Sequence, residues 1–117
     1  MTVQEIANRL VELCRQDQYE TAQTELYAED AESVEPAYSP TPYVKGLDAI
    51  REKGRYFQST IEEVYGGYVG EPIFAGNHFA VAMGMDVSVK GMGRVTMDEI
   101  AVYQVKDGKI VKEQFMF

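Results

Sequence analysis

Two carboxylates near the end of the chain stand where apolar side chains are expected. Residues 94–117 read RVTMDEIAVYQVKDGKIVKEQFMF, in which apolar and polar residues alternate as in a strand with two unlike faces. Glu99 falls among the apolar residues of the first half, and Glu113 lies between Val111 and Phe115 in the second. A carboxylate on an apolar face costs free energy unless it is paired, hydrogen-bonded or set in a wet cavity. Both glutamates are therefore candidate catalytic residues.

The turn between these two runs decides whether the two carboxylates share a face. Residues 106–109, Lys-Asp-Gly-Lys, predict a hairpin, because Gly accepts a positive φ and Asp bonds its own backbone. A two-residue turn places Glu99 opposite Met116. A three-residue turn with a glycine bulge places Glu99 opposite Phe115 instead, and it puts Glu99 and Glu113 on one face.

Two carboxylates in one partly dry cavity would provide an acid and a base. Each negative charge raises the pKa of the other group, so that one carboxyl holds its proton near neutral pH. The alternative is that both glutamates pair with Lys or Arg side chains or lie at a wet rim. His78 is interpreted as a surface residue next to a turn.

Methionine and aromatic side chains are the candidates for contact with a ligand. Met83, Met85 and Met97 can line an adaptable apolar pocket, although filling of the core is the more usual role for methionine. Eight Tyr and five Phe are present, and aromatics of this kind can wall a small-molecule site. The further candidate ligand-binding residues are Tyr43, Tyr56, Tyr103 and Phe115.

Helices are predicted in the first half of the chain. Thr2 and Glu5 have the spacing of a capping box, and an apolar stripe at helical spacing follows. Cys14 lies on this stripe and is expected to be a buried thiol. A second, shorter helix is expected over residues 20–27 and a third over residues 47–61. In the third helix we expect Gly54 to allow a close approach of the helix backbone to the sheet.

Strands dominate the second half. A short strand over residues 31–35 is followed by an irregular, proline-rich loop over residues 36–46. From Glu62 onward the apolar period becomes two, which predicts strands over residues 64–74 and 78–89 before the final hairpin. This order predicts an α+β fold: N-terminal helices packed on a strongly curved, mainly antiparallel sheet that forms a cone-like half barrel. The gap between sheet and helices is the expected ligand cavity.

Composition excludes several classes of function. The 117 residues are expected to form a single domain, and the net charge of −8 argues against nucleic acid or an anionic membrane as partner. One His and one Cys make a zinc or iron cluster improbable, and no glycine-rich fingerprint indicates a nucleotide. We therefore expect no metal and no cofactor. Neither a signal peptide nor an apolar run of about 20 residues is visible, which favours a cytoplasmic protein.

Residues 17–53 resemble the nuclear transport factor 2-like superfamily, and most of all its SnoaL-like branch. The resemblance is carried by three motifs in order, namely LYAEDA (residues 26–31), VEP (residues 34–36) and GLDAI (residues 46–50), together with the terminal hairpin. It implies a cystatin-like cone of helices and curved sheet, often dimeric through the outer face of the sheet. The outer patch expected for a homodimer comprises Ile100, Val102, Ile110 and Met116.

The resemblance also allows the site to be compared with related enzymes. In ketosteroid isomerases the proton-transferring carboxylate precedes the proline of the VEP motif, which implies a catalytic role for Glu35, although a strand end is usually solvated. The oxyanion-binding Tyr and Asp of those enzymes are replaced here by Leu10 and Ala101. The Arg and two Asp of limonene epoxide hydrolases are replaced by Glu99, Ala101 and Phe115. SnoaL-type cyclases use an acid/base carboxylate in this end of the cavity.

Two functions follow as hypotheses. In the first, the protein binds an apolar or amphipathic small molecule, and any reaction is a cofactor-independent isomerisation or cyclisation with a glutamate as acid/base. In the second, it is a non-catalytic dimeric binding or interaction module whose cavity is filled by its own side chains. The sequence leaves open whether the protein is an enzyme.

Overall fold

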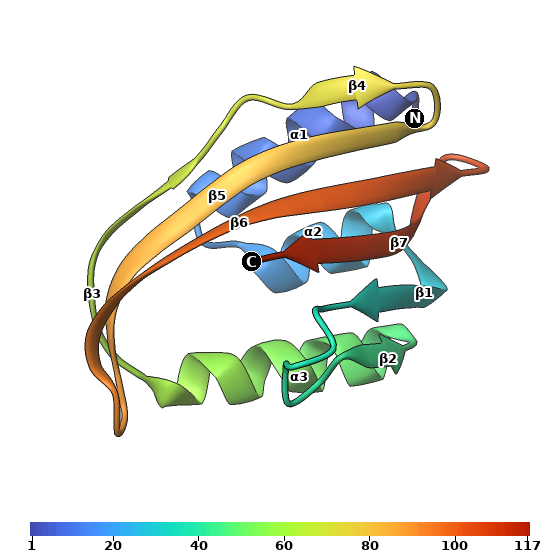
Figure 1. Ribbon diagram of the computed structural model, residues 1–117. Helices are drawn as coiled ribbons and strands as arrows, with labels where there is room; N and C mark the ends of the chain where they lie inside the picture. The colour runs from blue at the N-terminus through green and yellow to red at the C-terminus, as the bar shows by residue number, and fades with distance from the viewer.

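The computed structural model describes all 117 residues as three helices and a seven-stranded sheet (Figure 1). The helices are α1 (Val3–Arg15), α2 (Tyr19–Leu26) and α3 (Leu47–Thr60). The strands are β1 (Tyr27–Val34), β2 (Tyr43–Lys45), β3 (Ile61–Val69), β4 (Ile73–Ala75), β5 (His78–Val89), β6 (Gly93–Lys106) and β7 (Lys109–Met116).

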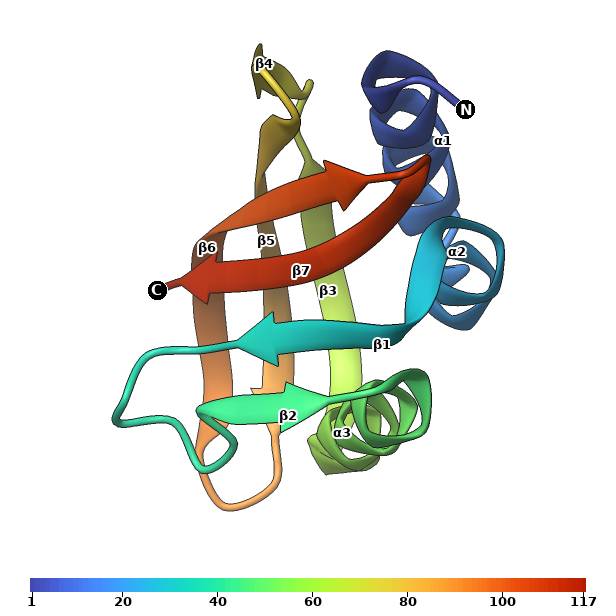
Figure 2. The ribbon, with the colours of Figure 1, turned by 90° about the vertical axis from the view of Figure 1, so that its right-hand side faces the viewer.

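The sheet is mixed, strongly curved and not closed. Its strand order is β2-β1-β7-β6-β5-β3, and β4 pairs separately with β5. The predicted antiparallel meander is confirmed for β3, β5, β6 and β7, whereas β1 enters parallel to β7. Figures 1 and 2 show the long strands β5 and β6 bending, so that the sheet wraps around the side on which the helices lie. The α+β class and the curved sheet are therefore as predicted.

The first helix begins as its sequence predicts. The Thr2 side chain accepts a hydrogen bond from the Glu5 N–H at 3.1 Å, and the Glu5 carboxylate accepts one from the Thr2 N–H at 2.9 Å, which completes the capping box. The apolar stripe of α1 is buried against the sheet and includes Cys14. Burial raises the pKa of the Cys14 thiol to about 12, so this group belongs to the core and stays protonated.

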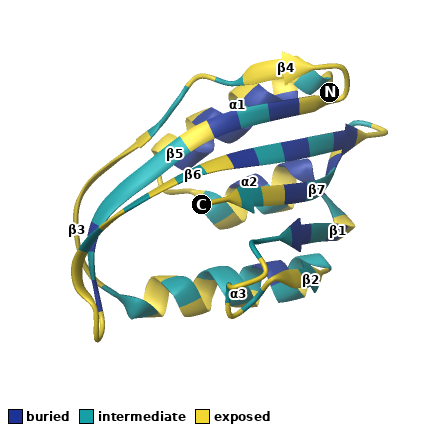
Figure 3. Cartoon of the chain, viewed as in Figure 1, coloured by how far each residue is buried: buried dark blue, intermediate teal, exposed yellow.

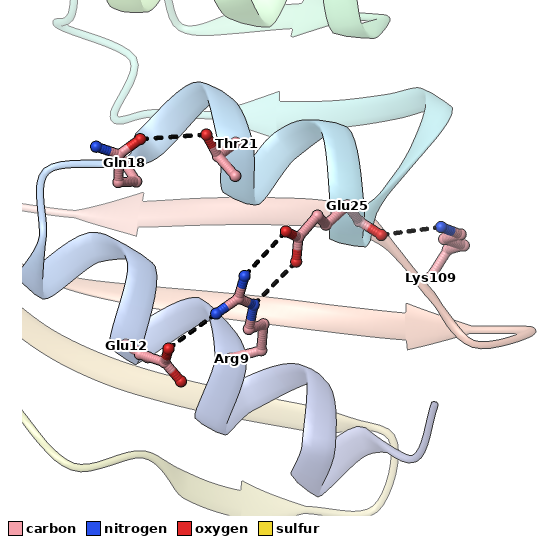
Figure 4. Close-up of polar contacts among 6 residues, drawn as sticks. All are labelled: Arg9, Glu12, Gln18, Thr21, Glu25 and Lys109. Carbon is pink, nitrogen blue, oxygen red and sulfur yellow. Dashed lines mark hydrogen bonds and ion pairs between the residues drawn. The ribbon is translucent and has the colours of Figure 1, made fainter.

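Ion pairs on the surface fasten α1 to α2 (Figure 4). The Arg9 guanidinium donates to both carboxylate oxygens of Glu25 at 2.9 Å and to Glu12 at 2.8 Å. The Lys109 ammonium donates to the Glu25 carbonyl oxygen at 3.0 Å, which connects the same helix to β7. Because these side chains are exposed, solvent screens the ion pairs and their contribution to stability is small. Their main effect is to fix the orientation of the helical hairpin.

Two strand boundaries differ from the prediction. Strand β1 begins at Tyr27, directly after α2, instead of at residue 31. The proline-rich loop contains the short strand β2, which pairs antiparallel with β1. Three residues between Pro42 and Gly46 give too short a pattern to indicate a strand, and this strand forms by pairing with β1 across the proline-rich loop.

The predicted strand over residues 64–74 is broken into β3 and β4. Its path leaves the sheet at Gly70, whose N–H still donates to the Ala82 carbonyl at 2.8 Å, and Pro72 follows. A proline has no N–H for the ladder, which explains the break.

The final hairpin has a register that neither sequence alternative gives. Asp107 and Gly108 have φ values of 52° and 74° and form a two-residue turn, so that Val105 pairs with Ile110. A β-bulge then leaves Val111 without a partner. The extra residue shifts every later pair by one position.

The core lies where α1, α2 and the adjacent ends of the strands meet, and β3 contains no buried residue (Figure 3). Ile110 is fully buried, so its prediction as part of an exposed outer patch is wrong. It precedes the bulge and therefore faces the core together with its partner Val105. Gly54 was also misinterpreted, because a methyl group at its Cα would meet no atom within 4 Å.

Gly54→Ala is therefore expected to stabilise the protein. An alanine in a helix interior is favoured over glycine by roughly 0.5–1 kcal/mol, and the added methyl group has space. Gly67→Ala is the contrasting variant, since its Cβ would lie 2.8 Å from the Gly84 carbonyl oxygen in the neighbouring strand, and a loss of about 1–3 kcal/mol is expected. Urea denaturation measures both changes. A destabilised Gly54→Ala variant would show that α3 packs more tightly than described.

Candidate functional site

The concave face of the sheet brings most of the predicted site residues together. Strand pairing places Met83 opposite Glu99 and Met85 opposite Met97. On the neighbouring pair of strands, Phe115 lies opposite Ala101, two residues from Glu99. Apart from Ala101, which is buried, these side chains are partly buried. Around Glu99 the face is therefore apolar and accessible to solvent in part.

Glu113 lies on the same face but deeper, and it is 4 % exposed. The bulge in β7 places it opposite Tyr103 in β6, while Ser33 of β1 lies beside it on the other side. The Tyr27 hydroxyl donates to Oε1 of Glu113, and the Ser33 hydroxyl donates to Oε2 at 2.6 Å. Burial raises the pKa of Glu113, and the two hydroxyl groups act in the opposite direction. Both of its oxygens are thus occupied within the protein.

The hydrogen bonds continue from Ser33 to an ion pair. The Lys53 ammonium of α3 donates to Ser33 Oγ at 2.6 Å and lies 2.6 Å from Glu35 Oε2. The Ser39 hydroxyl of the proline-rich loop donates to the other oxygen of Glu35 at 2.7 Å. The side chains of Lys53 and Glu35 are only 13 % and 17 % exposed. We refer to this connected set as the polar chain, which consists of Tyr27, Glu113, Ser33, Lys53, Glu35 and Ser39.

Glu99 makes no hydrogen bond or ion pair within the protein. It is nevertheless close enough to the polar chain for the charges of Glu35, Glu113 and Lys53 to change its pKa. Burial raises the pKa of Glu99 to about 7; the carboxylates of Glu35 and Glu113 act in the same direction, and the Lys53 ammonium opposes them. Near neutral pH this carboxyl group therefore exists in both protonation states. That is the condition under which one group can accept and return a proton.

The sequence left open whether Glu99 and Glu113 share a face and whether each is paired or solvated, and the answer differs between the carboxylates. Glu99 and Glu113 do lie on one face, as the three-residue turn predicted, although the partner of Glu113 is Tyr103 instead of Ala101. Glu113 is neither paired with a cation nor at a wet rim, because two hydroxyl groups hold it. Glu35 is paired with Lys53 instead of solvated.

The predicted tyrosines are not assembled around the carboxylates. Tyr103 is buried and stacks on Phe79 with ring centres 4.8 Å apart, so it lies within the wall of the site. Tyr43 is half exposed and donates to Glu32 at 2.7 Å. Tyr56 is 67 % exposed on α3. His78 is exposed, as interpreted from the sequence.

Lys53 and Ser33 were not identified as site residues from the sequence, although the pattern of apolar residues around each one indicates an inward-facing position. Lys53 follows the buried Ile50 by three residues and precedes Phe57 by four, so it lies on the inward stripe of α3. A lysine on such a stripe needs a partner. Ser33 alternates with Ala31 in β1 and with Glu35 directly after the strand, which directs all three side chains to the same face.

None of the helices combines the length and the apolar character that crossing a membrane would require.

Comparison with known proteins agrees with this architecture. The family model described as SnoaL-like domain matches residues 1–117. A proposed SnoaL-like polyketide cyclase from Mesorhizobium loti is 39% identical over 100% of both chains, with a TM-score of 0.93. None of the curated proteins matches the chain.

More distant structures share the fold alone. A protein of unknown function with a cystatin-like fold from Xanthomonas campestris is 12% identical over 99% of this chain and 90% of its own, with a TM-score of 0.82. TerC, which was crystallised with polyporic acid, is 19% identical over 98% and 90% of the two chains, with a TM-score of 0.76. With the curved sheet, the helices on its concave side and a family match over the whole chain, this protein belongs to the SnoaL-like family.

Proposed function

We propose that this protein binds an apolar or amphipathic small molecule against the concave face of its sheet and transfers a proton on that molecule with Glu99 as acid/base. The observation that carries the proposal is the unpartnered Glu99 carboxyl among the methionines of the inner face. A ligand that covers Met83 and Met97 would bring a carbon atom or a heteroatom to this carboxyl. It would also exclude water from it.

Glu99 is preferred over the other two carboxylates because it alone is free to exchange a proton with a ligand. Glu113 accepts hydrogen bonds at both oxygens, and Glu35 is held by Lys53 and Ser39. The pKa of Glu99, about 7, also lies near neutral pH, where general acid–base catalysis is most efficient. The other two carboxylates raise this pKa by their charge, so all three contribute to the chemistry.

Proton transfer of this kind starts isomerisation, cyclisation and dehydration. The Mesorhizobium loti protein described as a polyketide cyclase is the relative that supports cyclisation. TerC, bound to polyporic acid, supports an aromatic or conjugated ligand on the same scaffold. We expect neither a metal nor a cofactor to take part in the step.

A homodimer through the outer face of the sheet accompanies this function in the proposal. Ile100 and Met116 are paired across the hairpin and are 50 % and 44 % exposed, with the partly buried Val102 two residues from Ile100. Neighbouring exposed apolar side chains on the outer face of a sheet are typical of a symmetric contact between copies. The same patch supports the second candidate function, a non-catalytic dimeric module.

Binding can be tested with N-phenyl-1-naphthylamine, an uncharged dye whose fluorescence rises in apolar surroundings. The wild-type protein is expected to bind it, and Met97→Lys is expected to weaken binding at least about tenfold, because a charge replaces part of the apolar wall. Thr96→Lys is the matched control, since Thr96 is the exposed preceding residue on the opposite face of β6. Equal effects of the two variants would contradict a ligand site on the concave face.

The role of Glu99 predicts how stability depends on pH. The pKa of Glu99 is raised in the folded protein, so ionising it there costs free energy that is absent in the unfolded chain. Relative to Glu99→Gln, the wild type should therefore lose roughly 1–3 kcal/mol of unfolding free energy as pH rises from about 4.5 to about 8. Urea denaturation at several pH values measures this difference. Glu62→Gln controls for the loss of a surface carboxylate, and a difference between wild type and Glu99→Gln that does not change with pH would contradict a raised pKa.

A further inference from the structure

The Lys53 ammonium has one more hydrogen-bond donor than the protein uses. An ammonium group has three N–H donors, and two of them are directed to Ser33 and Glu35. Its nitrogen also lies 5.4 Å from the centre of the Phe115 ring. Phe115 is partly exposed on the concave face and lies opposite Ala101, two residues along β6 from Glu99. The cation is thus held beside the surface on which the proposed ligand would lie.

The proposed reaction requires such a donor. When a carboxylate removes a proton from a carbon next to a carbonyl group, negative charge develops on the carbonyl oxygen and must be stabilised. Leu10 and Ala101 occupy the places compared above with oxyanion donors, and both are buried and apolar. Lys53 is the cation whose charge acts on Glu99. The positive charge that the reaction needs is therefore provided by Lys53 of α3, and not by the positions of Leu10 and Ala101.

We propose that Lys53 donates its third N–H to the carbonyl oxygen of the substrate, and that the substrate is therefore a carbonyl compound with an acidic neighbouring C–H bond on an apolar body. Ketones, thioesters and β-dicarbonyl compounds belong to this class. This inference rests on the proposed function, because it needs a ligand on the concave face with Glu99 as base. It adds the chemical group that the site recognises.

The step balances within the site. The Glu99 carboxylate takes the proton, the C–H electron pair becomes the carbon–carbon double bond of an enolate, and the carbonyl π electrons move to the oxygen held by Lys53. Return of the same proton from Glu99 to another carbon of the conjugated system gives isomerisation. If the enolate carbon instead attacks a second carbonyl of the same molecule, a carbon–carbon bond forms and the new alkoxide takes the proton from Glu99.

The polar chain keeps the ammonium in place for this role. Glu35 and Ser33 hold Lys53 from two directions, and Ser39 and Glu113 in turn hold these partners. Glu35 is thus a positioning residue for Lys53 and does not itself meet the substrate. The charged groups around the ammonium are the carboxylates of Glu35, Glu99 and Glu113, so the fully ionised site carries more negative than positive charge.

Three probes of similar shape separate apolar binding from recognition of the carbonyl group and of the enolate. 2-Tetralone has a carbonyl and an acidic C–H, 2-naphthol imitates the enolate when ionised, and naphthalene has neither group. Exchange of the acidic protons of 2-tetralone in deuterated water, followed by proton NMR, measures the chemistry. We expect Lys53→Met to lower the exchange rate at saturating probe roughly 10²–10³-fold and to leave naphthalene affinity unchanged. Lys53→Arg should recover part of the rate, and Lys106→Met, at an exposed lysine, controls for net charge.

Ionisation of bound 2-naphthol provides a second readout that does not depend on turnover. With Lys53 present, the absorbance of naphtholate should appear at a lower pH for bound than for free probe, and Lys53→Met should abolish this shift. Naphthalene binding shows in the same samples that each variant is folded.

The outcomes distinguish the two proposals. If naphthalene binds but Lys53→Met changes neither exchange nor naphthol ionisation, the role of Lys53 is wrong and the binding site stands. Bound 2-naphthol that ionises in the wild type no more readily than in water likewise overturns it. If none of the three probes binds, the site on the concave face is wrong, and the role of Lys53 falls with it.

Discussion

The burial of one carboxylate is the constraint on which the rest of this structure depends. Glu113 is almost inaccessible to water, and an unpaired carboxylate at this depth would be costly. Tyr27 and Ser33 from β1 offset part of that cost with two hydrogen bonds, and Ser33 in turn accepts a hydrogen bond from Lys53. One residue of β7 is in this way linked to β1 and, through the lysine, to α3. The same hydrogen bonds fix the positions of the charges that act on Glu99.

The bulge at Val111 makes this arrangement possible. Without the extra residue, the alternation of β7 would direct Glu113 to the outer face while Ile110 faced the core. With it, an apolar residue fills the core near the turn and a carboxylate enters the core three residues later. The shift also places Phe115 on the concave face beside Lys53. A local irregularity in one strand thus determines the chemistry of the site, as is common for bulges near functional residues.

Sequence patterns predicted the fold and the inner face of the sheet well. The capping box of α1, the alternation of β5 and the Asp-Gly turn are each encoded within a few neighbouring residues, and all three occur in the structure. Likewise, Glu99 and Met97 were placed correctly because strand periodicity alone determines their face. The positions of β2, Ile110 and the partners of Glu113 were not predictable in the same way. They depend on the pairing of β1 with β2 and with β7 and on a bulge, which no short stretch of sequence specifies.

The central claim is that Glu99 is a free acid/base group, whereas Glu113 is held by its neighbours. A titration of the glutamate carboxyl carbons by carbon-13 NMR tests it most directly, with Glu99→Gln used to assign the signal. We predict one carboxyl with a midpoint near pH 7 in the wild type, absent from the variant. If the Glu99 signal instead titrates near pH 4.5, as an exposed glutamate does, the carboxyl is solvated or paired in solution and this account of the site is wrong.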